Sequence, residues 1–178
     1  MPNWCENQLV VRGEPDEVRK MVEFVKGENG DFDFNTIIPY PAHFKEQDAK
    51  VEKMRAEGVN WNDIPSDGYN SGGYDWCCEN WGTKWNANVL DVDVYGGVAS
   101  YFIDTAWSPP LPVIHELSKK FPTLYFEITF GEPGMDFSGV YGYLDGNCMR
   151  EDNGDYQEYG QYDYEEEEEE DEEEEPSS

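Results

Sequence analysis

Close to its C-terminus the chain has an unbroken run of eleven acidic residues, from Glu165 to Glu175. Residues 151–178 as a whole contain 16 Asp and Glu and no Lys or Arg. Like charges at this density repel one another and cannot form a core, so we expect this segment to be a disordered acidic tail. The folded domain must then come from residues 1–150, a length that suits one domain.

The predicted domain is acidic as well. Of the formal net charge of −28, the tail accounts for −16 and residues 1–150 for −12. Such a charge repels the phosphate backbone of nucleic acids and anionic lipid surfaces, but it attracts basic surfaces. We therefore expect a basic protein surface as partner, and neither direct nucleic-acid binding nor membrane contact. The oligomeric state stays open.

Two observations predict a cytosolic location. No apolar stretch approaches the roughly 20 residues that a membrane-spanning helix needs. The first residues, Met1–Glu6, lack the basic start and the apolar run of a secretory signal.

The cysteines argue against a metal centre. The chain has four of them: Cys5, Cys77, Cys78 and Cys148. None forms a C-x-x-C pair, and only His43 and His115 could complete a zinc site. Reduced, mostly buried thiols are the simpler interpretation. We expect neither a metal site nor another cofactor.

The first 30 residues predict a strand followed by a helix. Residues 7–12 read as a strand that ends at Gly13. Pro15 suits the first helical position, because its missing N–H needs no partner there. An apolar stripe at helical spacing follows: Val18, Met21, Val22 and Val25.

Residues 30–85 are less regular, and we interpret them as an insertion on a smaller scaffold. We expect a short extended segment over residues 32–38, a charged helix from about His43 to Glu57, and a loop over residues 68–73. The predicted helix holds a third of the basic residues of the chain, namely Lys45, Lys50, Lys53 and Arg55. This helix should therefore form a patch of opposite sign.

Alternation returns at Val89. A strand over residues 89–95, a Gly96-Gly97 turn and a return strand over residues 98–106 predict a hairpin. In the first strand the alternation places Leu90, Val92 and Val94 on one face and Asp91 and Asp93 on the other. Ser108 as N-cap and Pro109 as first residue predict a helix, and strands should follow over residues 124–130 and 140–144.

The resulting order is strand, helix, insertion, strand, strand, helix, strand and a further strand. This order predicts an α+β fold, the split βαβ or ferredoxin-like sandwich. We expect an antiparallel sheet with both helices on one face and the other face partly open.

The densest motif spans Asp75–Asn86, with Asn80-Trp81-Gly82-Thr83-Lys84-Trp85 at its centre, and Thr105–Pro110 echoes it. Together with Met1–Asn7 and Ile38–Pro39, these motifs resemble the YubB-like, Api-type ferredoxin-like domain family. The resemblance covers nearly all of residues 1–145 and leaves the acidic tail outside the family pattern. It implies the βαββαβ scaffold, genes of plasmids, phages and bacterial mobile elements, and hence the cytoplasm of a bacterial host cell. It implies no established activity and no catalytic residues.

The Trp motifs have two interpretations. In the first, the indoles fill space between insertion and sheet, and Lys84 lies along an aromatic face with its ammonium in water. In the second, they line a ligand cleft with polar groups beside them. The candidate cleft residues are Asn80, Trp81, Thr83, Lys84, Trp85, Thr105 and Trp107. Buried Trp is usually structural, which favours packing.

Carboxylates on the predicted strands offer a second candidate surface: Asp91, Asp93, Asp104 and Glu127. Paired carboxylates serve in acid–base chemistry or hold metals, but a polar outer strand face produces the same pattern. Tyr125 and either Tyr141 or Tyr143 should lie on the open face, as in sheets that stack bases. The surrounding negative charge disfavours RNA binding there.

These observations favour a non-enzymatic interaction protein of mobile-element type whose acidic surface engages a basic protein surface. One concrete form is a nucleic-acid mimic that blocks a host protein. The alternative is a small-ligand-binding or enzymatic domain with a Trp-lined cleft around residues 80–85 and 105–110. Catalytic residues cannot be named from the sequence.

Overall fold

The computed structural model describes residues 3–156. At the centre of its sheet is strand β1 (Trp4–Arg12), in which every second residue from Cys5 to Val11 is buried. Helix α1 (Pro15–Phe24) follows, with Pro15 in its first turn as predicted. The predicted apolar stripe of this helix, from Val18 to Val25, is buried.

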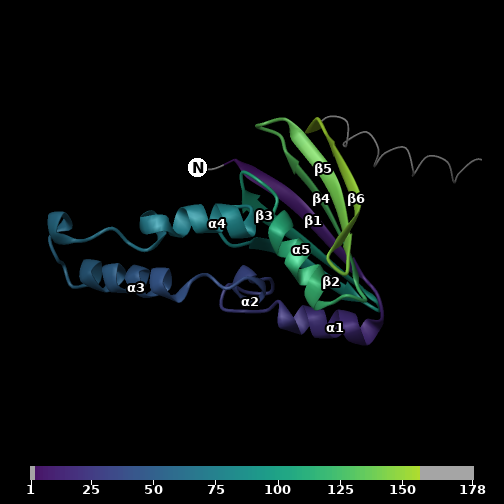
Figure 1. The fold of residues 1–178 in the computed structure, drawn as a ribbon, viewed down its shortest axis with the longest axis horizontal. Coiled ribbons are helices and arrows are strands. Elements are labelled where there is room, and N and C mark those ends of the chain that lie inside the picture. The colour runs from purple at the N-terminus through teal and green to yellow at the C-terminus, as the bar shows by residue number, and fades with distance from the viewer. Residues whose placement is uncertain (1–2, 157–178) are drawn as a thin grey trace, which may run out of the picture.

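Five further strands complete the sheet: β2 (Asn88–Tyr95), β3 (Val98–Ala106), β4 (Tyr125–Glu132), β5 (Phe137–Leu144) and β6 (Asn147–Gly154). Their order is β2-β3-β1-β4-β5-β6, and all neighbours are antiparallel (Figure 1). Strands β2, β3, β1 and β4, with α1 and α5 (Leu111–Lys120), form the βαββαβ arrangement. The predicted ferredoxin-like α+β fold is therefore confirmed, and β5 and β6 extend it.

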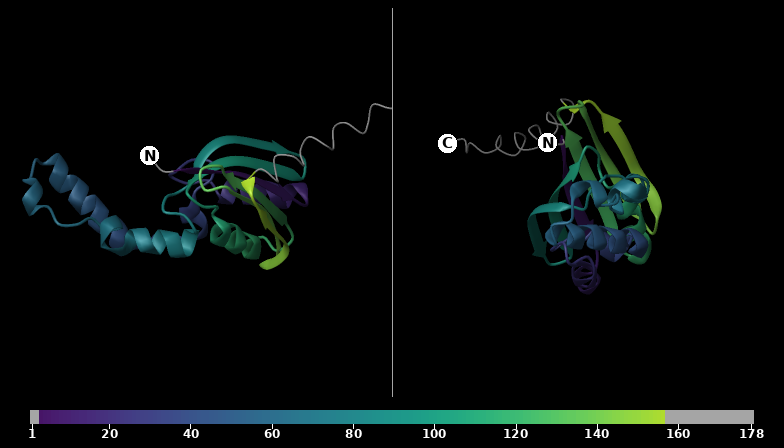
Figure 2. Two further views of the ribbon diagram at one scale, coloured as in Figure 1. Left: turned by 90° about the horizontal axis from the view of Figure 1, so that it is seen from above. Right: turned by 90° about the vertical axis from the view of Figure 1, so that its left-hand side faces the viewer.

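Both helices pack on one face of the sheet. The core combines α1 and α5 residues such as Met21 and Leu117 with strand residues such as Leu9, Tyr101 and Phe126. These strand residues alternate with exposed ones, so they share one face. We call it the helix-covered face and the opposite side the open face (Figure 2).

Residues between α1 and β2 form a helical arm that projects from the sheet (Figures 1 and 2). Its elements are α2 (Phe34–Ile37), α3 (Ala42–Ala56), the 3-10 turn η1 (Trp61–Asp63), the π-helical turn η2 (Tyr69–Gly73) and α4 (Tyr74–Trp81). The base of the arm belongs to the core, because Phe32, Phe34, Ile37, Cys77 and Trp81 are buried in it. None of the helices within residues 3–156 has the length and apolar character needed to cross a membrane.

The arm differs from its prediction at two places. Residues 34–37 are helical rather than extended, because the Asp33 side chain caps α2 by accepting a hydrogen bond from the Asn35 N–H (2.9 Å). Within the expected loop over residues 68–73 the chain forms a turn that is kinked at Ser71 and Gly72, where the backbone is not helical. This turn leads into α4, a helix that the sequence did not predict.

The predicted helix over residues 43–57 is confirmed as α3, but its expected positive patch is largely neutralised. Three of its four cations form ion pairs: Lys45 with Glu28 (3.3 Å), Lys53 with Glu57 (3.9 Å) and Arg55 with Asp67 (3.4 Å).

The start of α5 also differs from the prediction. Pro110 occupies the N-cap position and the helix begins at Leu111. Ser108 does not cap it, because its hydroxyl donates to the Gly82 carbonyl instead (2.6 Å).

Strand faces differ from the simple alternation at two places. A β-bulge at Leu90 leaves this residue unpaired and 60% exposed, so Val89 rather than Leu90 shares the inner face with Val92 and Val94.

Tyr141 and Tyr143 pair with Ile128 and Phe126 on the helix-covered face. Only Tyr125 of the three predicted open-face tyrosines lies on the open face.

The predicted boundary between domain and tail falls inside β6. Glu151 pairs with Tyr141, and Asp152 pairs with Val140, so the sheet includes the first residues assigned to the tail. The predicted disorder of the tail from residue 157 onward lies outside the described residues.

Candidate functional site

The motif residues of the sequence divide into two groups, and the first is a buried polar network at one end of the sheet. Asn7, 4% exposed, donates from Nδ2 to the carbonyls of Cys5 (2.8 Å) and Ile103 (3.0 Å) and to the Thr105 hydroxyl (2.9 Å). These bonds link β1 to β3. Thr105 is fully buried, so it serves the fold and is closed to a ligand.

Two hydroxyl groups tie the α4–β2 connection to the β3–α5 connection, and a third braces the latter internally. Thr83 donates to the Ala106 carbonyl (2.8 Å), Ser108 to the Gly82 carbonyl (2.6 Å) and Thr105 to the Ser108 carbonyl (2.7 Å). The predicted cleft residue Thr83 therefore holds the two loops against each other, and Thr105 fixes the β3–α5 loop at the end of β3.

Two more of the predicted cleft residues also stabilise the fold. Asn80 donates to the Trp76 carbonyl within α4 (2.9 Å). Trp81 is 4% exposed, donates from Nε1 to the Ile38 carbonyl (2.9 Å) and packs edge-on against Phe34. These contacts agree with the packing interpretation.

The second group is exposed and forms a Trp–Lys cluster, which comprises Trp4, Lys84, Trp85 and Trp107. The Lys84 ammonium lies 3.7 Å from the Trp107 ring centroid and 4.3 Å from that of Trp85. Trp4 lies beside Trp85, with 6.3 Å between ring centroids. The three indoles are 39–43% exposed. The sequence motifs predicted that Lys84, Trp85 and Trp107 lie together, but they favoured packed indoles and did not include Trp4.

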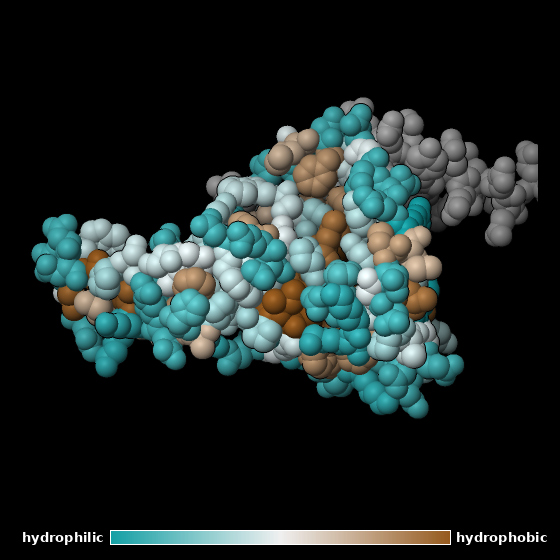
Figure 3. Space-filling model, in the orientation of Figure 1, coloured by the Kyte–Doolittle hydropathy of each residue, from teal (hydrophilic) through white to brown (hydrophobic). Residues whose placement is uncertain are grey.

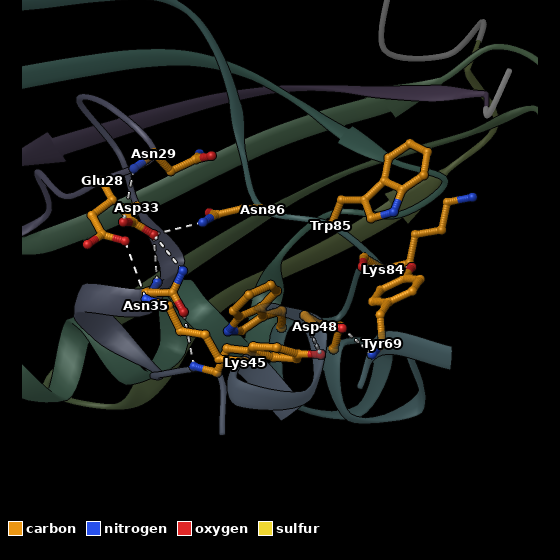
Figure 4. Close-up of a pocket in the computed structure, with 13 residues that line it drawn as sticks. Glu28, Asn29, Asp33, Asn35, Lys45, Asp48, Tyr69, Lys84, Trp85 and Asn86 are labelled. Carbon is orange, nitrogen blue, oxygen red and sulfur yellow. Dashed lines mark hydrogen bonds and ion pairs between the residues drawn. The ribbon is translucent and has the colours of Figure 1, made fainter. Parts of the chain in front are cut away.

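A cavity of about 400 Å³ lies on the arm side of this cluster (Figure 4). Lys84 and Trp85 stand at one end of it, and Asp33 and Asn86 lie at the other. Trp81 also lines it. Three of the seven predicted cleft residues line the cavity, but its other walls include α3 residues such as Lys45 and Asp48 and none of residues 105–110.

A buried carboxylate organises the inner end of the cavity. Asp33 accepts hydrogen bonds from the side chains of Asn86 (2.7 Å) and Asn35 (3.0 Å) and from the backbone N–H groups of Asn35 and Asn29. Burial by itself raises the pKa of Asp33, but the bonds from Asn86 and the backbone outweigh it and lower the pKa below 3.8. The carboxylate is thus ionised and already well supplied with donors.

The side chains of the outer wall of the cavity also form hydrogen bonds within the protein. Asp48 accepts from the Tyr69 N–H (2.9 Å) and from the Tyr40 hydroxyl (3.3 Å). Burial, followed by the charge of Asp48, raises the pKa of Tyr40. Burial also raises the pKa of Tyr69 to about 12, so both phenols stay protonated. Sequence reasoning missed this wall because it comes from residues far from the Trp motifs.

The open face of the sheet carries an acidic patch on β1, β2 and β3. Glu6 lies opposite Asp104, Asp91 opposite Phe102 and Asp93 opposite Ser100. We call Glu6, Asp91, Asp93 and Asp104 the acidic sheet face. No ion pair within residues 3–156 includes any of the four. Burial and then the charge of Glu6 raise the pKa of Asp104.

The fourth predicted acidic residue behaves differently. Glu127 lies between Arg12 (3.8 Å) and Arg150 (3.4 Å), which neutralise it.

On the opposite side of the molecule, hydrophobic residues appear as separate patches among hydrophilic ones (Figure 3).

The thiols and the acids show no arrangement that marks a reaction centre in the described part of the chain. Cys5 and Cys77 are buried, and burial raises the pKa of each thiol to about 12. Cys78 is half-buried and Cys148 exposed. Among residues 3–156, no group of three or more His, Cys, Asp or Glu side chains is placed to hold a metal ion.

Comparisons with known proteins agree with the fold. A family model described as the ferredoxin-like domain in Api92-like proteins matches residues 80–175. The crystal structure of protein api92 from Yersinia pseudotuberculosis is similar, with 13% identity and a TM-score of 0.53 over 88% of this chain and 98% of that one. At this identity the likeness shows the fold alone.

No curated protein matches the chain. The family match runs through the acidic run, so the expectation that the tail lies outside the family pattern was wrong. Because the match covers more than half of the sequence, the chain belongs to the family of Api92-like proteins with a ferredoxin-like domain.

Proposed function

We propose that the chain is a non-enzymatic interaction protein of phage or plasmid type, which binds a basic protein surface in the cytoplasm of a bacterial host. The acidic sheet face is the binding surface. Nucleic-acid mimicry, in which a host DNA-binding protein is the target, is the narrower form of the proposal. The tail adds charge that increases the rate and range of encounter.

The observation that supports this proposal is the difference between paired and unpaired carboxylates. On the helices, Glu17 and Glu23 each form an ion pair with a lysine at 2.6 Å, and Glu116 forms one with Lys119. The four carboxylates of the acidic sheet face have no such partner within residues 3–156. Unpaired like charges on one face repel each other, and a cationic partner relieves that repulsion.

The neighbouring apolar side chains strengthen the argument. Phe102, 41% exposed, lies between Asp91 and Gln8 on the open face. Trp4 lies on the same face of β1 as Glu6, because strand side chains alternate. Exposed aromatic residues beside charges are typical of binding hot spots.

A small-ligand site is a second candidate, because the cavity of about 400 Å³ has the size of known ligand pockets. The polar groups of the cavity argue against ligand binding as the main function, because Asp33 and Asp48 already accept hydrogen bonds from the protein itself.

A defined cationic probe tests the proposal with the full chain. We expect a short peptide of alternating Arg and Ser to bind, with affinity that falls steeply between about 50 and about 200 mM salt. The triple variant Asp91→Asn, Asp93→Asn, Asp104→Asn should bind about tenfold more weakly. A charge-matched control, Glu17→Gln, Glu23→Gln, Glu116→Gln, should bind like the unchanged protein.

A third variant separates the contribution of the tail to binding from that of the domain. When Glu165–Glu175 are replaced by Gln and Asn, the remaining affinity should still depend on the acidic sheet face. Equal affinities of the triple variant and its control would contradict the proposal. Saturable binding of a neutral small molecule in the cavity, with no peptide binding, would favour the second candidate.

A further inference from the structure

Two indole rings enclose a cation at the edge of the open face. The Lys84 ammonium contacts the faces of both Trp85 and Trp107, at 4.3 and 3.7 Å from their ring centroids. No carboxylate within residues 3–156 lies within ion-pair distance of this ammonium. The rings alone hold the charge, by a cation–π interaction.

The walls of this enclosure are fixed by the fold. Trp85 directly follows Lys84 in the sequence, and Trp107 directly follows Ala106. A hydrogen bond from the Thr83 hydroxyl to the Ala106 carbonyl (2.8 Å) joins these two segments. Trp107 is held at φ 72°, a left-handed conformation that is unfavourable for a Trp, and its N–H donates to the Asn3 carbonyl (3.0 Å). Strain of this kind at an exposed residue is common at ligand clamps.

The enclosure is continuous with the acidic sheet face. Trp4 contacts Trp85 and lies opposite Ala106, and Glu6 follows on the same face of β1, opposite Asp104. A guanidinium group stacks on indole faces and also forms bidentate hydrogen bonds with carboxylates. An arginine of a basic partner therefore matches both halves of this surface.

We infer that Trp85 and Trp107 form a cage for an arginine side chain of the partner, and that Lys84 occupies this cage until the partner displaces it. The inference rests on the proposed function, because the partner reaches the cage across the acidic sheet face. Lys84 acts as a competing cation, which shields the two indoles in the free protein and lowers the affinity for arginine.

Peptide binding by variants of the full chain tests the cage. Lys84→Met removes the competing cation, so the Arg–Ser peptide should bind about three- to tenfold more tightly. Trp85→Ala and Trp107→Gly should weaken binding about tenfold. Gly suits the left-handed backbone at position 107, so this variant should keep its melting temperature and exclude unfolding as the cause.

The arm provides a matched control. Trp61 is 73% exposed and also carries a cation over its ring, the Arg55 guanidinium at 5.5 Å, but it lies in η1 on the arm. Trp61→Ala should bind the peptide like the unchanged protein.

The outcomes distinguish the two proposals. Loss of binding in the acidic-face triple variant, with Trp85→Ala and Trp107→Gly equal to Trp61→Ala, would overturn the cage and leave the proposed function standing. If the acidic-face triple variant binds the peptide like the unchanged protein, both the cage and the proposed function are overturned. Weaker or unchanged binding by Lys84→Met would show that Lys84 does not compete.

Displacement of Lys84 can be observed directly by NMR. The ring currents of Trp85 and Trp107 should shift the side-chain proton resonances of Lys84 strongly upfield in the free protein. Addition of the Arg–Ser peptide should move them toward ordinary lysine values, while a Lys–Ser peptide should do so at higher concentration. Lys84 resonances that stay shifted at saturation would overturn the inference.

Discussion

The two faces of the sheet are made from alternate residues of the same strands, yet they differ in nearly every physical property. On β1, Leu9 and Val11 are fully buried under the helices, whereas Glu6 and Gln8 are exposed on the open face. On the helix-covered face, Asn7 is buried and forms three hydrogen bonds within the protein. The open face leaves carboxylates without partners. One face therefore stabilises the fold, and the other is available for binding, so substitutions should separate the two properties.

The largest contrast is expected between two phenylalanines. Phe126→Ala on the helix-covered face removes a fully buried ring and should lower the free energy of unfolding by about 3–5 kcal/mol. Phe102→Ala on the open face removes a ring that is 41% exposed and should lower it by about 1 kcal/mol. Urea denaturation measures both values. Similar losses would contradict the distinction between the faces.

The next contrast concerns adjacent polar residues of β1. Asn7→Ala removes the hydrogen bonds to the Cys5 and Ile103 carbonyls and to the Thr105 hydroxyl and should lower the free energy of unfolding by about 2–3 kcal/mol. Gln8→Ala, whose side chain is exposed, should change it by less than about 0.5 kcal/mol. A large effect at Gln8 would show that the open face also contributes to stability.

Two carboxylates with opposite pKa shifts sharpen the comparison. The folded-state pKa of Asp33 is lowered, so its stabilisation is present above the ordinary value of 3.8 and is lost as the pH falls through the folded pKa. Asp33→Asn should therefore lower the free energy of unfolding by about 1–2 kcal/mol at neutral pH, and the difference should vanish in acid. Thermal unfolding at several pH values measures it.

The pKa of Asp104 is shifted in the opposite direction. Its pKa is raised, so the penalty of its charge is complete above the folded pKa and disappears as the pH falls below 3.8. Asp104→Asn should raise the melting temperature slightly at neutral pH and leave it unchanged in strong acid. Destabilisation at neutral pH would show that the Asp104 carboxylate has a structural partner.

The smallest effect is expected at Tyr101, whose hydroxyl is buried on the helix-covered face without a hydrogen-bond partner in the described part of the chain. Tyr101→Phe should leave the free energy of unfolding unchanged or raise it by up to about 1 kcal/mol. Tyr40→Phe is the control, because its hydroxyl donates to Asp48 and its loss should be destabilising. Destabilisation by Tyr101→Phe would indicate that the hydroxyl has a partner.

Local periodicity predicted most of the fold. The stripe from Val18 to Val25 and the alternation of β3 and β4 placed α1 and these strands correctly. Elements that depend on single side-chain contacts were missed, such as α2, which Asp33 caps, and the start of α5, where Ser108 bonds to Gly82 instead.

The candidate site was less predictable, because segments distant in the sequence form it. The Trp motif did not reveal that Trp81 is buried while Trp85 and Trp107 are exposed, since Trp81 contacts the distant residues Phe34 and Ile38. Nor could the sequence show that Arg12 and Arg150 neutralise Glu127 while Asp91 stays unpaired. Strand order and register decide which charges meet.

A footprint of the Arg–Ser peptide by amide NMR tests the central claim most directly. If the open face is the binding surface, saturating peptide should shift the amide resonances of Glu6, Gln8, Asp91–Asp93 and Ser100–Asp104 and leave those of α1 and α3 in place. Shifts confined to α3 and the cavity wall around Asp48 and Tyr69, with the open face unchanged, would contradict the account.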